Sequence, residues 1–338
     1  MKTSDFDYHL PPELIAQTPI EPRDAARLLV LERATGNITH TIFREIGHFL
    51  NPGDLLVLNQ TRVIPARLYG HKSTGGRIEV LLLRRVDETT WEALVGGKGM
   101  GRGKRLQLDD GPAGEVIEVL DGAERRLRFE TPLEEYLARA GHVPLPPYIH
   151  TPLADPNRYQ TVYANHPGSA AAPTAGLHFT PELFARLEAQ GIGRAFVTLH
   201  IGLDTFAPVT VADPRQHIIH TEWCQVPQAT ADAVNRTKQA GGRVIGVGTT
   251  SVRTLESAAR ATHGAGLSAF EGPTNLFILP GYAFQIVDAM VTNFHLPKST
   301  LLMMMSAFAG RARMLATYEI AKQEGYRFFS FGDAMLIL

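Results

Sequence analysis

The sequence of 338 residues contains a single cysteine, Cys224, and no long apolar run. One cysteine excludes an internal disulfide and any cysteine-based zinc site, so we expect Cys224 to be a small packed residue. The longest apolar run, Leu301–Phe308, is well short of the roughly 20 residues that a membrane-spanning helix needs. The N-terminus carries Asp5 and Asp7 and lacks the apolar segment of a signal peptide. These absences predict a cytosolic protein without a membrane association.

Signatures of several common enzyme classes are also absent. No G-x-x-x-x-G-K-[ST] motif exists, which excludes the phosphate-binding loop of many nucleotide triphosphatases. No G-x-S-x-G motif exists, so a serine nucleophile of the hydrolase type has no support. His217 and His220 lie near Glu222, but no second group has zinc-ligand spacing. The sequence therefore predicts no metal site.

The charges are nearly balanced, with 33 Lys and Arg against 34 Asp and Glu, for a formal net charge of −1. This balance argues against a protein that coats nucleic acid non-specifically, although a local basic patch is compatible with it. Such a patch could lie at Gly97–Lys104, where glycine alternates with long or basic side chains. The pattern could follow a phosphate backbone, but on local grounds it favours a solvated hairpin tip.

The pattern of predicted strands and helices changes twice along the chain. Between residues 61 and 148, short alternating runs are separated by Gly, Asp or Pro turns, which predicts an antiparallel barrel or a small sandwich. In residues 1–60 and 149–338, strands alternate with helices, which predicts one α/β domain with a layered, mainly parallel sheet. The predicted elements of that domain include a helix at Ile42–Leu50 and strands at Leu55–Asn59, Leu276–Leu279 and Tyr326–Phe331.

Polar residues follow several predicted strands of the α/β domain. Ligands of open α/β sheets bind at the carboxyl ends of strands, so these residues are candidates for a site. They are His200 with Gly202 and Asp204, Thr249 and Thr250 with Arg253, Asn293 with His295, and Asp333. Each one alone could be a satisfied buried polar residue. The four clusters together predict a cleft.

The stretch Arg243–Ser257 shows how one such cluster would work. An apolar strand ends at Gly248, and a helical pattern begins directly after it. A helix N-terminus offers free N–H groups and a positive dipole end to an anion or a polar ligand. The hydroxyls of Thr249, Thr250 and Ser251 would suit such a ligand, as would Arg253. A capped strand–turn–helix unit without any ligand remains the alternative on these residues alone.

Small side chains fill Gly168–Thr180 until His178 and Phe179. They let something approach the backbone closely, either another element of the chain or a flat ligand.

Seven segments, spread over the whole chain and in the same order, resemble one family of enzymes. They are FDYHLPPELIAQTPIEPRDAARLLVL, LNQTRVIPARLYGHKSTGG with IEVLLL, YQTVYA, AAPTAGLHFT, VGTTSVRTLES, PGYAFQIVDAMVTNFHLPKSTLLMMMSAFAG and YRFFSFGDAMLI. The family is that of the S-adenosylmethionine:tRNA ribosyltransferase-isomerases of queuosine biosynthesis. One departure is Asp204, which stands where the family more often has glycine.

The resemblance implies an enzyme that moves the ribosyl part of S-adenosylmethionine onto 7-aminomethyl-7-deazaguanine at the wobble position of tRNA. The products would be epoxyqueuosine in the tRNA, adenine and methionine. S-adenosylmethionine would be a consumed substrate, and no prosthetic group or metal is expected. The resemblance also implies a β-barrel inserted into an α/β domain, and we expect a monomer.

This chemistry needs groups that exchange protons near neutral pH. The C–H next to a sulfonium needs a base, adenine leaves more readily when protonated, and the substrate amine must be neutral to attack. Histidines and environment-shifted carboxylates can meet these needs. The catalytic candidates are His178, His200, Glu222, His295 and Asp333. The candidates for holding the nucleoside, or the carboxylate of the methionine part, are Gly248, Thr249, Thr250, Arg253 and Asn293.

The RNA partner would be an anticodon arm, whose loop bases are splayed and stacked while Arg and Lys contact phosphates. The basic candidates for that contact are Arg62, Lys72, Lys98, Arg102 and Lys104. Two rivals are a non-catalytic RNA-binding adaptor on a nucleotide-binding fold and a transferase of unrelated substrate. The latter would bind a triphosphate, for which the sequence has no phosphate loop.

Overall fold

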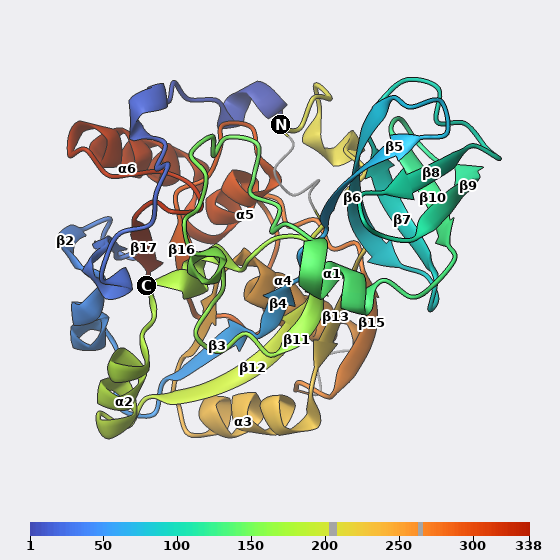
Figure 1. Cartoon of the computed structure of the whole chain (residues 1–338). Helices are drawn as coiled ribbons and strands as arrows, with labels where there is room; N and C mark the ends of the chain where they lie inside the picture. Colours follow the sequence, from blue (N-terminus) through green and yellow to red (C-terminus); the bar gives the residue numbers. More distant parts are fainter. Residues whose placement is uncertain (203–207, 263–265) are drawn as a thin grey trace. The chain divides into compact units, whose positions relative to one another are not determined.

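The computed structural model describes residues 1–202, 208–262 and 266–338, and the chain divides into two compact units (Figure 1). The first unit contains Met1–Thr61, Pro146–His166 and Pro173–Leu338, and the second contains Arg62–Leu145 and Pro167–Ala172. The second unit differs from the expected insertion because it includes Pro167–Ala172. The reason is that β11 (His166–Ser169) pairs with β4 (Thr61–Val63).

The first unit is built on a nine-stranded sheet. In spatial order its strands are β15 (Phe270–Thr274), β13 (Glu222–Val226), β12 (Gly193–Leu199), β3 (Leu55–Asn59), β14 (Val244–Val247), β16 (Ala289–Asn293), β17 (Ala334–Ile337), β1 (Arg27–Leu31) and β2 (Ile38–Ile42). The four central strands, β12, β3, β14 and β16, run parallel to one another. Their carboxyl ends therefore meet at one edge of the sheet, which we call the carboxyl edge.

The α/β class is confirmed, but the sheet is more mixed than expected. Besides the four central strands, only β17 and β1 pair in parallel, whereas β2, β13 and β15 pair antiparallel with their neighbours. β17 also runs antiparallel to β16. One cause is local: β2 returns directly from β1 through a short turn, and a connection that short can only give an antiparallel pair.

Two apolar layers cover the sheet. Because side chains alternate along a strand, odd and even strand positions enter different layers. Leu29 and Val57 join one layer, which contains α3 (Gln228–Gln239), α4 (Thr249–Ala261), α5 (Thr300–Ala309) and α6 (Arg311–Gln323). Leu28 and Leu56 join the other, with α2 (Pro181–Ala189) and the 3-10 helices η4 (Phe43–Phe49) and η6 (Thr174–His178). The sheet is thus the middle of three layers.

The second unit is a closed antiparallel barrel of six strands, which settles the choice between barrel and sandwich. Its strands are β5 (Arg67–Lys72), β6 (Arg77–Arg85), β7 (Thr90–Val95), β8 (Arg105–Leu108), β9 (Ala113–Val119) and β10 (Glu124–Phe129), followed by α1 (Glu134–Ala140). β9 closes the barrel by pairing with both β8 and β10. Closure leaves no open sheet edge.

Three predicted elements are wrong in position or type. Residues 276–279 form no strand, and the nearest strand is β15. Residues 326–331 are largely irregular, and the strand of this region is β17, which begins at Ala334. Tyr326 and Phe328 are fully buried in the core, so their apolar pattern reported burial rather than strand pairing. The segment 42–50 forms the 3-10 helix η4 instead of an α-helix.

A buried carboxylate on α4 organises the loop that enters β16. Glu256 is fully buried, and its oxygens accept hydrogen bonds from the backbone N–H groups of Gln285, Ile286 and Val287 at 2.9–3.0 Å. The hydroxyl of Tyr282 donates a fourth bond at 3.0 Å. One side chain thereby fixes both α4 and the start of a central strand.

Replacing Glu256 with alanine should leave three backbone N–H groups without acceptors, those of the buried Ile286 and Val287 and that of the exposed Gln285. Each orphaned group costs roughly 1–3 kcal/mol, so we expect Glu256→Ala to lower the free energy of unfolding by about 3 kcal/mol or more. Urea denaturation followed by circular dichroism measures this loss. Glu188→Ala is the matched control, because Glu188 is exposed and its ion pair with Arg194 spans 3.8 Å. Equal urea midpoints for the two variants would contradict the role of Glu256.

Candidate functional site at the carboxyl edge of the sheet

Asn59, the last residue of β3, joins three elements at the carboxyl edge. It is fully buried. Its Oδ1 accepts bonds from the N–H groups of Leu199 and Thr61 at 3.1 Å, and its Nδ2 donates to the carbonyl of Leu199 at 3.0 Å. The same Nδ2 donates to the Thr250 hydroxyl at 3.2 Å. The end of β3 therefore holds the end of β12 and the first turn of α4 in place.

His200 lies directly after β12, at the end of the strand where the sequence placed it. Its Nδ1 lies 2.8 Å from the Thr61 hydroxyl, and its ring stacks on Trp223 at 5.3 Å and 17°. Burial, with the nearby charge of His166, lowers the pKa of His200 to about 4. The imidazole is therefore neutral at pH 7, and its Nε2 makes no hydrogen bond with the described residues.

The first turn of α4 matches the predicted strand–turn–helix unit. Gly248 has φ 85°, a conformation that favours glycine, and it ends β14 just before the helix. The Thr250 hydroxyl faces Asn59, and Thr249 is 8% exposed. Ser251, however, is fully buried, and its hydroxyl donates to the Val247 carbonyl at 2.8 Å. Ser251 is thus used within the helix and is not available to a ligand.

Arg253 and Glu222 form a buried ion pair. The guanidinium also donates to the carbonyls of His220 and Thr274 at 3.1 and 3.0 Å. Glu222 accepts a bond from the N–H of Gly202 at 3.0 Å. The expectation that Arg253 binds a ligand carboxylate is therefore at odds with the structure, because Arg253 ties α4 to β13 and β15. Glu222 in turn holds the segment that follows His200.

His178 and Asn293 approach the same edge from η6 and β16. His178 is 4% exposed. Burial and the charges of Arg327 and Arg23 lower its pKa to about 4, and the Asn293 side chain opposes part of this shift. His178 Nε2 and Asn293 Oδ1 have no hydrogen-bond partner in the described chain. His178 also lines a cavity of about 20 Å³, with Ser330 on its wall. That volume holds about one water molecule.

The small residues before His178 accommodate another part of the chain. A side chain at Gly176 would meet the Tyr163 hydroxyl at 2.0 Å. Close packing of η6 against Tyr163, rather than a flat ligand, therefore explains the glycine at this position.

His295 lies two residues beyond β16. Its Nε2 lies 2.6 Å from the Thr292 hydroxyl, and the Tyr8 hydroxyl donates to its backbone carbonyl at 2.5 Å. Burial lowers the pKa of His295 to about 3, so this ring is neutral as well.

Asp333 reaches the carboxyl edge for a reason that the sequence did not indicate. It precedes β17 instead of ending a strand, and because β17 runs antiparallel to β16, Ala334 pairs with Asn293. Its oxygens accept bonds from the N–H groups of Arg27 and Arg327 at 2.9 and 2.8 Å. Asp333 is 2% exposed, and these bonds hold the backbone at Arg27 and Arg327 in place.

Two further expectations concern Asp204 and metal. Asp204 lies outside the described residues. Within residues 1–202, 208–262 and 266–338, no three His, Cys, Asp or Glu side chains gather so as to hold a metal ion. No helix of that part of the chain is long and apolar enough to cross a membrane.

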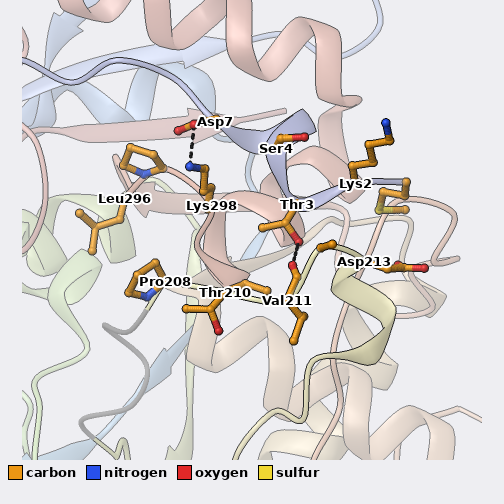
Figure 2. Close-up of a pocket in the computed structure, with 14 residues that line it drawn as sticks. Lys2, Thr3, Ser4, Asp7, Pro208, Thr210, Val211, Asp213, Leu296 and Lys298 are labelled. Atoms are coloured by element: carbon orange, nitrogen blue, oxygen red, sulfur yellow. Dashed lines mark hydrogen bonds and ion pairs between the residues drawn. The ribbon is translucent and has the colours of Figure 1, made fainter.

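A groove of about 1070 Å³ lies beside the segments that follow β12 and β16 (Figure 2). The N-terminal residues form one wall, where Thr3 donates to the Val211 carbonyl at 2.5 Å. Lys298 lies 2.7 Å from Asp7, which neutralises its charge. Val209 and Leu296 make part of the remaining lining apolar.

The five basic residues predicted to contact RNA all belong to the barrel unit. Lys72 is half-buried and donates to the Lys98 carbonyl, while Arg62, Lys98, Arg102 and Lys104 are exposed. None of the five has a carboxylate within 4 Å among the described residues, so their charges stay available.

Asn59 and Thr61 are the site residues that the sequence analysis missed. The signal was present, because Asn59, Gln60 and Thr61 follow the apolar run Leu55–Leu58 directly. β3 is a central parallel strand, so the strand-end rule that identified His200 applies to it equally.

The chain is similar to known proteins along its whole length. The family model described as queuosine biosynthesis protein matches residues 3–337. S-adenosylmethionine:tRNA ribosyltransferase-isomerases from Symbiobacterium thermophilum and Clostridioides difficile are 54% and 53% identical, each over 100% of both chains. The crystal structure of an S-adenosylmethionine tRNA ribosyltransferase from Thermotoga maritima has 42% identity and a TM-score of 0.59, covering 99% of this chain and 100% of its own.

These matches confirm the resemblance that the seven sequence segments indicated. The barrel of the second unit and the mixed sheet of the first fit it as well. The chain belongs to the family of queuosine biosynthesis proteins.

Proposed function

We propose that this chain transfers the ribosyl part of S-adenosylmethionine to 7-aminomethyl-7-deazaguanine at the wobble position of a tRNA. The same reaction isomerises the ribosyl group, gives epoxyqueuosine and releases adenine and methionine. The observation that carries the proposal is the network at the carboxyl edge, in which Asn59 joins Thr250 and the end of β12, and Thr61 holds His200. Relatives that match over their whole length are named S-adenosylmethionine:tRNA ribosyltransferase-isomerases, which supports the same reaction.

His200 is our candidate for the base that removes the proton next to the sulfonium. The Thr61 hydroxyl lies 3.5 Å from the His166 carbonyl, to which it can donate its proton. Thr61 then accepts from His200 Nδ1–H, which leaves the lone pair on Nε2. A neutral imidazole with one nitrogen held and the other free is suited to accept a proton. His178 and His295 are neutral too and stay candidates for the other proton transfers.

The first turn of α4 is our candidate for holding a polar part of S-adenosylmethionine. Gly248, Thr249 and Thr250 offer backbone N–H groups and hydroxyls at a helix N-terminus, which suit a ribose or a carboxylate. Asn293 faces the edge from β16 with an unpartnered oxygen. Arg253 and Glu222 act indirectly, by fixing this turn and the segment after His200, and Asp333 by fixing the start of β17.

The anticodon arm of the tRNA is the proposed partner of the barrel's free basic residues, Arg62, Lys72, Lys98, Arg102 and Lys104. The active form that we propose is a monomer. We place the reaction in the cytosol, where its tRNA substrate is available.

Incubating the protein with S-adenosylmethionine and precursor tRNA tests the reaction. We expect one adenine released for each tRNA modified. A non-catalytic RNA-binding adaptor would bind the tRNA and release no adenine, and that result would sink the proposal.

Substituting His200 with glutamine should remove the proton acceptor while keeping a polar side chain. General acid–base groups contribute roughly 10²–10⁴-fold, so we expect single-turnover adenine release to slow at least 100-fold. Thr61→Val should slow it less, because the ring stays but its tautomer is no longer fixed. His48→Gln is the control, since His48 is 70% exposed. A His200→Gln rate within threefold of the control rate would rule out this role.

The proton affinity of His200 gives a prediction on pH. Its pKa in the folded protein lies near 4, below the usual 6.5, so protonation should occur only as the pH falls toward 4. NMR titration of ¹³C-labelled histidine, assigned with the His200→Gln variant, measures this midpoint. Adenine release should accordingly show no acid limb from His200 between pH 5 and 8. A midpoint near 6.5 would mean that the ring is as hydrated as a free histidine.

A further inference from the structure

An open groove of about 580 Å³ lies on the barrel, and none of the residues assigned to chemistry lines it. Its lining consists of Tyr69, Arg77, Ile78, Glu79, Gly96 and Gly97. All of them belong to the second unit, on β5, β6 and the segment after β7.

Strand alternation turns Tyr69 outward into this groove. Leu68 and Gly70 on either side of it are buried, whereas Tyr69 is 40% exposed. Its ring packs edgewise against His142 at 5.4 Å and 63°. The Tyr69 hydroxyl makes no hydrogen bond with the described residues. An aromatic ring that is held from one side and exposed to solvent is a platform on which another ring can stack.

The floor beside Tyr69 is bare backbone. Gly96 and Gly97 are both exposed, and the Gly96 N–H donates to the Glu79 carbonyl at 2.8 Å, which fixes the segment. Gly97 has φ 105°, and a side chain there would meet Lys72 Cε at 3.3 Å. A flat group can therefore approach this floor closely.

The charges around the groove are unbalanced in favour of cations. Elsewhere on the barrel, arginines such as Arg84 and Arg126 are paired with glutamates. Around the groove, Lys72, Arg77 and Lys98 have no carboxylate within 4 Å in the described ranges. Glu79 is the one carboxylate of the lining, and Arg67 neutralises it at 3.1 Å.

We propose that this groove binds an unpaired nucleotide of the tRNA, with its base stacked on Tyr69 and its flanking phosphates contacting Lys72 and Arg77. Stacking on aromatic side chains combined with cations along the backbone is the way in which proteins hold single-stranded nucleic acid. The inference rests on the proposed function for the identity of the RNA. It adds a binding site formed by the barrel unit alone.

Direct binding of the full-length protein to an anticodon stem-loop tests the proposal. We expect Tyr69→Ala to weaken binding about tenfold, as the loss of one stacked base does, and Tyr69→Phe to stay within twofold. Gly96→Leu should weaken binding comparably by filling the groove, because a side chain there meets its neighbours only at 3.5–3.7 Å. Val119→Ala is the control, since Val119 is 47% exposed on the same barrel.

Salt dependence separates stacking from charge. Arg77→Ala should lower the slope of log Kd against log salt by about 0.7, as expected for one phosphate contact, whereas Tyr69→Ala should leave the slope unchanged. A blunt RNA duplex of equal charge should bind the Tyr69→Ala variant and the unmodified chain equally.

Two outcomes would overturn the inference. One is stem-loop binding by Tyr69→Ala and Gly96→Leu equal to that of the Val119→Ala control. The other is equal weakening of duplex and stem-loop, which would indicate a general effect on charge or folding. Because binding is measured without turnover, a protein that releases no adenine would refute the proposed reaction and still allow this test.

Discussion

The complete satisfaction of one buried amide, that of Asn59, is the constraint on which the carboxyl edge depends. Its oxygen accepts two backbone bonds and its nitrogen donates two more. Any shift of β12 or of the first turn of α4 would leave one of these groups unpaired in the core, which is costly. The positions of His200 and Thr250 are therefore coupled through Asn59.

The histidines around this edge owe their lowered pKa values mainly to burial. His178, His200 and His295 all have lowered pKa values, and burial is the largest cause for each. A reaction that begins with a sulfonium gains from neutral surroundings, because cationic imidazoles would repel the substrate. The buried ion pair between Arg253 and Glu222 joins two opposite charges and therefore adds no net charge.

Local sequence patterns were sufficient where the residues themselves decide the structure. β3 has the predicted bounds, and the strand-end rule located His200. Local patterns failed where pairing between distant segments decides the structure. β17 is a strand because it pairs with both β1 and β16. Tyr326 and Phe328 have the apolar pattern of a strand, but they are buried in the core outside the named strands. The pairing of Arg253 with Glu222 could not be foreseen, because it depends on β13, a strand that the sequence pattern did not indicate.

The place of β17 in the sheet also bears on how the protein folds. β17 (Ala334–Ile337) lies between β1 and β16 instead of at an edge of the sheet. Its parallel partner β1 (Arg27–Leu31) is far away in the sequence, so this part of the sheet forms only when distant parts of the chain meet. Pairing between distant segments is slow, because the entropy cost of closing the loop comes before the contacts are gained. Until then β1 presents an open edge, which exposes the partly folded chain to aggregation.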